Sequence, residues 1–148
     1  MHAMVLAARG AKLTPLERPD PVPGLGQVRI KVSACGVCRT DLHVVDSELP
    51  DIPYPIIPGH EVVGRVEALG AGVTGLPVGM RVGVPWLGFT CGECFYCQAD
   101  KENLTRKAGA DFFKAIQTHT TVFPLEQANE ALSCLREGRL VGAAVLRP

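Results

Sequence analysis

The sequence predicts a mainly β fold with a few helices, in the mixed α+β class. Its 148 residues fit one domain, and 47% of them are hydrophobic, which is enough for a core. It holds 16 glycines and 12 prolines among many valines, a composition typical of short strands joined by tight turns. Helical spacing of apolar residues is clearest near the C-terminus, so we expect few helices.

The first strands are expected in the N-terminal third. Residues 3–9 are an apolar first strand, and residues 12–17 are a candidate hairpin partner. Residues 18–24 are rich in proline and form a rigid connector, because proline lacks the N–H that a central strand needs. Residues 27–34 alternate between apolar and basic side chains, which predicts a half-buried strand leading to Cys35 and Cys38. Its apolar face would carry Val28, Ile30 and Val32.

Further elements follow in the middle of the chain. Residues 41–47 are a candidate short helical turn, and residues 49–58 hold four prolines, which predicts an extended loop. Residues 60–69 form a valine-rich strand, in which Gly64 would let a neighbouring backbone pack closely. Residues 79–85 are another short strand.

Gly70–Gly75 matches the dinucleotide-binding pattern GxGxxG, but its context argues against that function. The pattern binds pyrophosphate only where it follows a strand and opens a helix. Here Leu76, Pro77 and Val78 come next, which favours a turn into another strand. We therefore interpret Gly70–Gly75 as a glycine-rich loop.

After residue 104 the pattern changes. Residues 105–117 predict a helix with an apolar side, and residues 118–123 predict a β-branched strand. Residues 125–137 predict a second helix that ends at Gly138, and residues 140–146 predict a last strand. The buried side of that second helix would comprise Leu125, Ala128, Leu132 and Leu135.

Charge and cysteine usage limit the function classes. There are 15 basic and 15 acidic residues, which argues against nucleic acid or an anionic membrane as the main partner. We see no secretory signal and no apolar run of membrane-spanning length, so we expect a cytoplasmic protein. In that compartment cysteines at CxxC spacing indicate metal ligands before disulfides. The six cysteines are Cys35, Cys38, Cys91, Cys94, Cys97 and Cys134.

The stretch ACGVCRTDLH, residues 34–43, is the most informative part of the sequence, together with Gly59-His60-Glu61. Cys38, His60 and Glu61 offer the donor types that zinc prefers. Thr40 and His43 follow the cysteine closely enough to relay a proton from a metal-bound oxygen. A cysteine taken alone is more often a small buried apolar residue, so the argument depends on the whole set.

GVCRTDLH followed by PGHE resembles the zinc-binding strands of the medium-chain, zinc-dependent alcohol dehydrogenases. Residues 1–104 resemble the catalytic domain of that family, which implies a GroES-like β-barrel. Residues 105–123 resemble a remnant from beyond the family's cofactor domain, and residues 124–148 resemble its closing helix and strand. The resemblance implies that the intervening Rossmann domain is missing, with the join at Leu104–Thr105.

The resemblance implies roles for single residues. Cys38 and His60 match two of the three protein ligands of the catalytic zinc, and Glu61 matches a carboxylate that can approach the metal. Thr40 and His43 match the proton-relay positions. Trp86 matches a position that lines the substrate pocket in the family; the alternative is an ordinary core aromatic.

A second, structural zinc of the family is held by four cysteines. Cys91, Cys94 and Cys97 match the first three, and Thr105 stands at the fourth. A hydroxyl is a poor zinc ligand, so the site should be weakened unless water, Asp100 or Glu102 completes it. The alternative is a metal-free loop with three thiols.

These implications give two hypotheses for function. The first is a zinc-binding catalytic domain without its NAD(P)-binding domain, with partial zinc occupancy and no catalysis by itself. The alternative is an oxidoreductase acting on small alcohols or aldehydes, with a cofactor site rebuilt by another chain or a dimer. We also expect self-association through apolar residues that the missing domain would cover: Phe112, Phe113 and Ile116.

Overall fold

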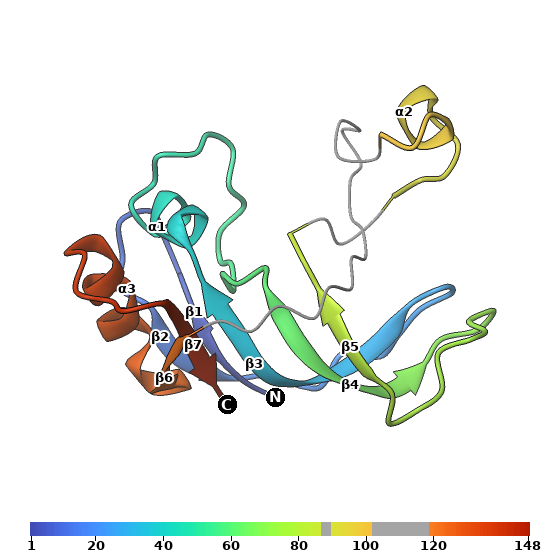
Figure 1. Cartoon of the computed structure of the whole chain (residues 1–148), viewed down its shortest axis with the longest axis horizontal. Coiled ribbons are helices and arrows are strands. Elements are labelled where there is room, and N and C mark those ends of the chain that lie inside the picture. Colours follow the sequence, from blue (N-terminus) through green and yellow to red (C-terminus); the bar gives the residue numbers. More distant parts are fainter. Residues whose placement is uncertain (87–89, 102–118) are drawn as a thin grey trace.

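The computed structural model describes residues 1–86, 90–101 and 119–148, and the strands in these ranges form two sheets (Figure 1). The two-stranded sheet pairs β1 (His2–Val5) with β2 (Thr14–Glu17). The five-stranded sheet has the order β5-β4-β3-β7-β6. Its strands are β3 (Val28–Val37), β4 (Val62–Leu69), β5 (Arg81–Val84), β6 (Thr120–Pro124) and β7 (Ala143–Arg147).

The described helices are short. They are α1 (Arg39–Val45), α2 (Phe95–Gln98), the 3-10 helix η2 (Leu125–Gln127) and α3 (Ala128–Arg136). The expected mainly β fold with a few helices is therefore confirmed. Among the described residues, no helix has the length and apolar character needed to span a membrane.

The predicted N-terminal hairpin is confirmed, but its first strand is shorter than residues 3–9. β1 ends at Val5 because Leu6 turns to pair with Ile56 of the proline-rich loop, with N···O distances of 2.8 and 3.0 Å. Leu6 is fully buried at that crossing. Residues 7–9 then run over the surface.

β3 is the central strand of the larger sheet, and it is longer than predicted. It continues to Val37, because its last three residues pair with β7 as well as with the loop before β4. Cys35 therefore lies inside the strand. Register shifts at Arg29/Ile30 and Val32/Ala34 interrupt the simple alternation, so Val32 is exposed and the expected single apolar face is not formed.

β4 and β5 confirm two expectations from the glycines. A Cβ at Gly64 would lie 2.3 Å from the backbone oxygen of Lys31, so the close approach of β3 requires glycine here. The Gly70–Gly75 loop connects β4 to β5, which pair antiparallel. The turn thus leads into a strand and opens no helix.

The C-terminal elements return to the N-terminal half of the chain. β7 pairs with β3, and β6 adds to β7 in parallel, with η2 and α3 as the crossover between them. The predicted helix at residues 125–137 is divided into η2 and α3, and it ends near Gly138, which has φ +66°. Ala128 and Leu132 are buried as predicted, and Leu125 and Leu135 pack at the core's margin.

α3 also buries two residues that were not predicted, Ala131 and Cys134. Its Asn129 side chain accepts from Leu13 N–H at 3.1 Å and donates to Leu13 C=O at 2.9 Å, which ties the helix to the N-terminal segment. The predicted helix at residues 105–117, the Leu104–Thr105 join and the apolar residues Phe112, Phe113 and Ile116 lie outside the described residues.

Candidate metal centre

Cys38 lies where β3 gives way to α1, and local hydrogen bonds fix its position. It is the N-cap of α1, and its Sγ accepts from Thr40 N–H at 3.3 Å. In return, Asp41 Oδ2 accepts from the Cys38 N–H at 2.8 Å, completing a capping box. The thiol is thereby held at the start of the helix, with only part of its surface exposed.

His60 meets Cys38 from the segment that leads into β4. Its Nε2 lies 3.0 Å from Cys38 Sγ, although the two residues are 22 positions apart. Its Nδ1 lies 3.3 Å from Asp41 Oδ1. One ligand atom from each of Cys38, Asp41 and His60 falls within 4.8 Å of the others. The predicted Cys38 and His60 are thus brought together.

Asp41 was not predicted, and its surroundings fit a nearby metal or imidazolium. The residue is 5% exposed, and its Oδ1 has no hydrogen-bond partner among the described residues. A buried unpaired carboxylate oxygen is costly unless a positive group compensates it. Asp41 follows Cys38 by three residues, which is the spacing of a capping box. This spacing was the only sequence signal that could have identified it.

Glu61 is placed differently from Cys38 and His60. Its side chain lies over Gly36, where an added Cβ would come within 2.3 Å of Glu61 Oε2. The structure therefore groups Asp41, and not Glu61, with the cysteine and the histidine. Glu61 as a metal ligand stays a prediction.

Thr40 and His43 both lie on α1, as expected for residues that follow the cysteine. Thr40 is exposed, and His43 Nδ1 lies in close contact with the carboxylate of Glu48. Trp86 follows β5 and is 63% exposed, so its alternative as a core aromatic is wrong. Trp86 also does not line the cavity between β1 and β3, which we call the cavity behind α1.

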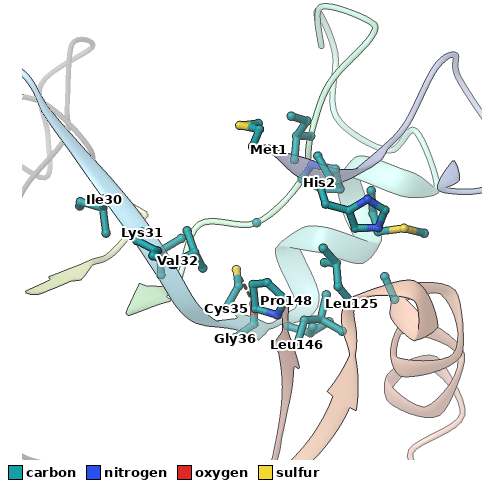
Figure 2. Close-up of a pocket in the computed structure, with 18 of the residues that line it drawn as sticks. Met1, His2, Ile30, Lys31, Val32, Cys35, Gly36, Leu125, Leu146 and Pro148 are labelled. Carbon is teal, nitrogen blue, oxygen red and sulfur yellow. Dashed lines mark hydrogen bonds between the residues drawn. The ribbon is translucent and has the colours of Figure 1, made fainter. Parts of the chain in front are cut away.

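That cavity has a volume of about 510 Å³ and was not predicted from the sequence. It lies between β1 and β3, and Figure 2 shows the Cys35 thiol directed from β3 into it. Burial raises the pKa of the Cys35 thiol. Asp41 and Gly59 also line the cavity, which therefore reaches the segment beside the candidate metal centre. Its apolar walls include Met4, Ile30, Val37, Leu125, Leu132 and Leu146.

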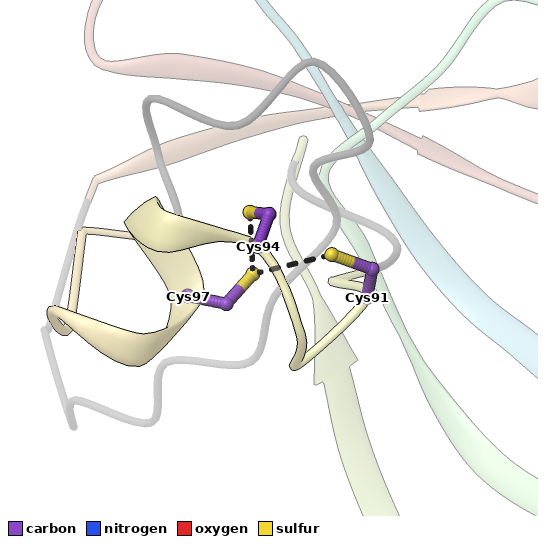
Figure 3. A group of neighbouring side chains, drawn as sticks. All are labelled: Cys91, Cys94 and Cys97. Carbon is purple, nitrogen blue, oxygen red and sulfur yellow. Dashed lines mark hydrogen bonds between the residues drawn. The ribbon is translucent and has the colours of Figure 1, made fainter.

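A second group of potential ligands surrounds α2. Cys94 caps the helix, Cys97 lies on it, and Cys91 precedes it (Figure 3). Cys97 Sγ lies 3.7 Å from Cys91 Sγ and 3.5 Å from Cys94 Sγ. Four Zn–S bonds of about 2.3 Å in a tetrahedron place sulfurs about 3.8 Å apart, so the spacing fits a metal site. Burial and the hydrogen bond between Cys97 and Cys94 raise the pKa of the Cys97 thiol.

The expected fourth position of this second group cannot be placed in the same way. Thr105 and Glu102 lie outside the described residues, and Asp100 is exposed with φ +54°. The three predicted cysteines are therefore brought together, while the residue that completes the site stays a prediction.

Comparison with known proteins shows that the chain is similar to alcohol dehydrogenases. The chain is 51% identical over 105 residues to an alcohol dehydrogenase of Rhizobium meliloti (strain 1021), covering 70% of this chain and 31% of that protein. It is 44% identical over 108 residues to an alcohol dehydrogenase of Geobacillus stearothermophilus, covering 72% of this chain and 32% of that protein. The chain thus spans about a third of the length of these relatives.

Solved structures of alcohol dehydrogenases are also similar to this chain. A thermostable alcohol dehydrogenase from Pyrobaculum aerophilum, bound to cobalt and zinc, superposes with a TM-score of 0.67 at 34% identity, covering 73% of this chain and 33% of that one. An alcohol dehydrogenase from E. coli CFT073 in complex with NADH gives 0.65 at 33% identity, covering 76% and 32%. Residues 24–131 match the family of the alcohol dehydrogenase GroES-like domain. The chain belongs to that family.

Proposed function

We propose that this chain is the zinc-binding catalytic domain of an alcohol dehydrogenase, and that it does not transfer hydride by itself. The observation that carries the proposal is the grouping of Cys38, His60 and Asp41 at the junction of β3, α1 and β4. The cobalt and zinc in the Pyrobaculum aerophilum structure support zinc as the metal.

Each residue of the group has a separate role in this proposal. Cys38 Sγ and His60 Nε2 supply the two donors that suit zinc best, and they already lie 3.0 Å apart. Asp41 faces the other ring nitrogen of His60, so it would fix the tautomer that leaves Nε2 free to bind. When bound here, zinc supplies Lewis-acid polarisation of a substrate oxygen. Two strong ligands make occupancy partial unless Glu61 or another group adds a third.

The proton released from an alcohol needs a route to solvent, and α1 offers one. Thr40 lies two residues after Cys38 and is exposed. His43 lies one turn further along the same helix, with Glu48 beside Nδ1. A carboxylate on one ring nitrogen favours a proton there and leaves the other nitrogen to accept. Thr40 and His43 would therefore relay the proton away from the candidate metal centre.

The second group has a supporting role in this proposal. Cys91, Cys94 and Cys97 would hold zinc weakly, since three thiolates leave one position of the tetrahedron to water or a carboxylate. Trp86 follows the C-terminal end of β5 and is exposed to solvent. It would line the substrate site, although it does not line the cavity between β1 and β3. The substrates would be small alcohols or aldehydes, as the names of the relatives suggest.

Hydride transfer also needs the nicotinamide held against the substrate. The glycine pattern at Gly70–Gly75 turns between two antiparallel strands, so it offers no helix N-terminus for a pyrophosphate. Without orientation of the nicotinamide, hydride transfer loses an effect on the order of 7–11 kcal/mol.

The second candidate is an enzyme completed by another chain or a dimer that supplies this cofactor site. The NADH in the E. coli CFT073 structure favours a nicotinamide cofactor in that case.

The test is an activity assay on the purified chain with added zinc, ethanol or benzyl alcohol, and NAD or NADP. We expect no increase in the absorbance of reduced cofactor and no cofactor binding by calorimetry. Turnover that requires zinc and is abolished in both Cys38→Ala and His60→Ala would show that the chain is active by itself. Cys35→Ala is the matched control, because Cys35 lies on β3 outside the Cys38–Asp41–His60 group.

A further inference from the structure

Between Cys91 and His119, the sequence offers three cysteine or histidine ligands, and these are Cys91, Cys94 and Cys97. After Cys97 the sequence has no cysteine or histidine before His119. The backbone of His119 is hydrogen-bonded to Ala143 at the start of β7. Cys134 is 7% exposed in the core on α3. An ion bound between Cys91, Cys94 and Cys97 would therefore have three sulfur ligands.

The spacing of the sulfurs is compatible with an ion that has three sulfur ligands. Cys97 Sγ lies 3.7 Å from Cys91 Sγ and 3.5 Å from Cys94 Sγ, and the three sulfurs all lie within 4.8 Å of one another. A three-coordinate ion with a lone pair has narrow S–ion–S angles and therefore needs sulfurs that lie close together. Figure 3 shows the Cys97 sulfur joined by dashed lines to the sulfurs of both Cys91 and Cys94.

Charge favours the same class of ion. Zn²⁺ with three thiolates has a net charge of −1, and residues 91–101 also carry Glu93 and Asp100 against one cation, Lys101. A trivalent ion with three thiolates is neutral. Cys97 is buried, so a neutral complex avoids part of the cost of placing a charge there.

We propose that Cys91, Cys94 and Cys97 form a three-thiol binding site for trivalent arsenic, with arsenous acid as the species that enters. Three As–O bonds break and three As–S bonds form. Each thiol proton leaves with a hydroxide as water, so three waters are released and neither arsenic nor sulfur changes oxidation state. This function goes beyond the proposed dehydrogenase domain, because it gives the three cysteines an ion other than zinc and uses none of the residues of the Cys38 centre.

The loop needs little rearrangement to make these bonds. Backbone hydrogen bonds from Gln98 to Cys94 at 3.0 Å and from Lys101 to Tyr96 at 2.8 Å close the turns that carry the cysteines. Ligands that are ordered before binding reduce the entropy cost of binding. The third As–S bond is then intramolecular and adds strongly to retention.

The experiment titrates the reduced, metal-free chain with sodium arsenite. We expect one arsenic per chain by native mass spectrometry, with the loss of three hydrogens and of three titratable thiols. In Cys97→Ser we expect retention through dialysis to fall on the order of a hundredfold, because the third bond is lost. Cys91→Ser should show the same loss. Because Cys91 lies outside α2, this second variant keeps the test valid if Cys97→Ser disturbs folding, and far-UV circular dichroism checks the fold of both variants.

Cys35→Ala is the control and should bind arsenic as the wild type does. Several results would overturn the proposal: only two thiols consumed, equal retention in the serine variants, loss of arsenic in Cys35→Ala, or full displacement by one equivalent of zinc. Retention in wild type and control alone, against an excess of zinc, supports it.

Discussion

Asp41 connects the two residues of the candidate metal centre. One carboxylate oxygen accepts from the backbone of Cys38, and the other faces His60. The same residue therefore completes the capping box of α1 and contacts the imidazole. Burial at 5% exposure removes water as an alternative partner, so both contacts must be made within the protein.

We predict that Asp41→Asn weakens zinc binding about 10- to 100-fold, the usual cost of losing a carboxylate that orients a metal-bound histidine. Asparagine keeps an oxygen that can accept from Cys38 N–H, so the cap and the fold should persist. Competition with a chromophoric chelator measures the affinity. Asp46→Asn is the control, because Asp46 follows α1 and pairs with Arg136 instead. Equal affinity in wild type and Asp41→Asn would contradict the orienting role.

A second residue-scale prediction concerns pH. Hydrogen bonds from Arg139 and Ser133 lower the pKa of Glu137 below its ordinary value of 4.5. Since the folded pKa is the lower one, Glu137 stabilises the fold above about pH 4.5, and this contribution is lost as pH falls through the folded pKa.

The measurement for Glu137 is urea unfolding of wild type and Glu137→Gln across pH 3 to 7. The wild type should be the more stable at pH 7, and the difference should shrink as the solution becomes acidic. Glu130→Gln is a control on the same helix, as Glu130 has no ion pair among the described residues. A difference that grows towards low pH would reverse the sign of the argument.

At the scale of elements, Gly64 allows β3 and β4 to pack closely. A side chain there would meet both the backbone of Lys31 and the Ile30 side chain, at 2.3 and 2.5 Å. The backbone cannot yield as a flexible side chain could. In the β3–β4 register Gly64 pairs with Val32.

We predict that Gly64→Ala destabilises the fold by about 1–3 kcal/mol, the usual cost of overpacking. Urea unfolding measures this change. Gly83→Ala is a matched control on β5 of the same sheet, where an added Cβ would only reach ordinary contact with Val62 O at 3.9 Å. If both variants lose the same stability, the cause is the general strand environment and not the close approach.

Elements with a strong local pattern were predicted well, and their ends were not. The β4 and β5 segments follow from valine-rich runs, and α1 begins two residues before the helical turn that was expected at residues 41–47. β1 ends early because Leu6 pairs with Ile56, and β3 runs late because Val37 pairs with Ala144. Both partners are distant in sequence, so no local pattern could locate these ends.

The candidate site divides in the same way. Cys38 and His60 were identifiable from zinc-type donors in a known order, and the structure brings them together. The cavity behind α1 was not identifiable, because its walls include both ends of the chain, Met1 and Pro148. Side-chain direction also escaped prediction: Glu61 lies over Gly36, while Asp41 takes the place beside His60.

At the scale of the whole molecule, apolar surface and net charge bear on association. Large apolar side chains stand out on the described surface, with Val22 86%, Leu25 83% and Val141 81% exposed. The formal net charge is zero at pH 7 and the isoelectric point is about 6.9. Exposed apolar patches favour contact between molecules, and a net charge near zero removes the repulsion that would oppose it.

We therefore predict concentration-dependent self-association that is strongest near pH 7 and weaker at pH 9, where the chain becomes negative. Light scattering over a concentration series measures it. The double variant Val22→Asp with Leu25→Asp should reduce association more than Thr74→Asp with Gln98→Asp, which adds the same charge at exposed polar positions. An equal reduction in both would mean that charge alone governs association, and the apolar connector before β3 would have no part in it. A scattering mass that stays monomeric at the highest concentration and pH 7 would refute the prediction.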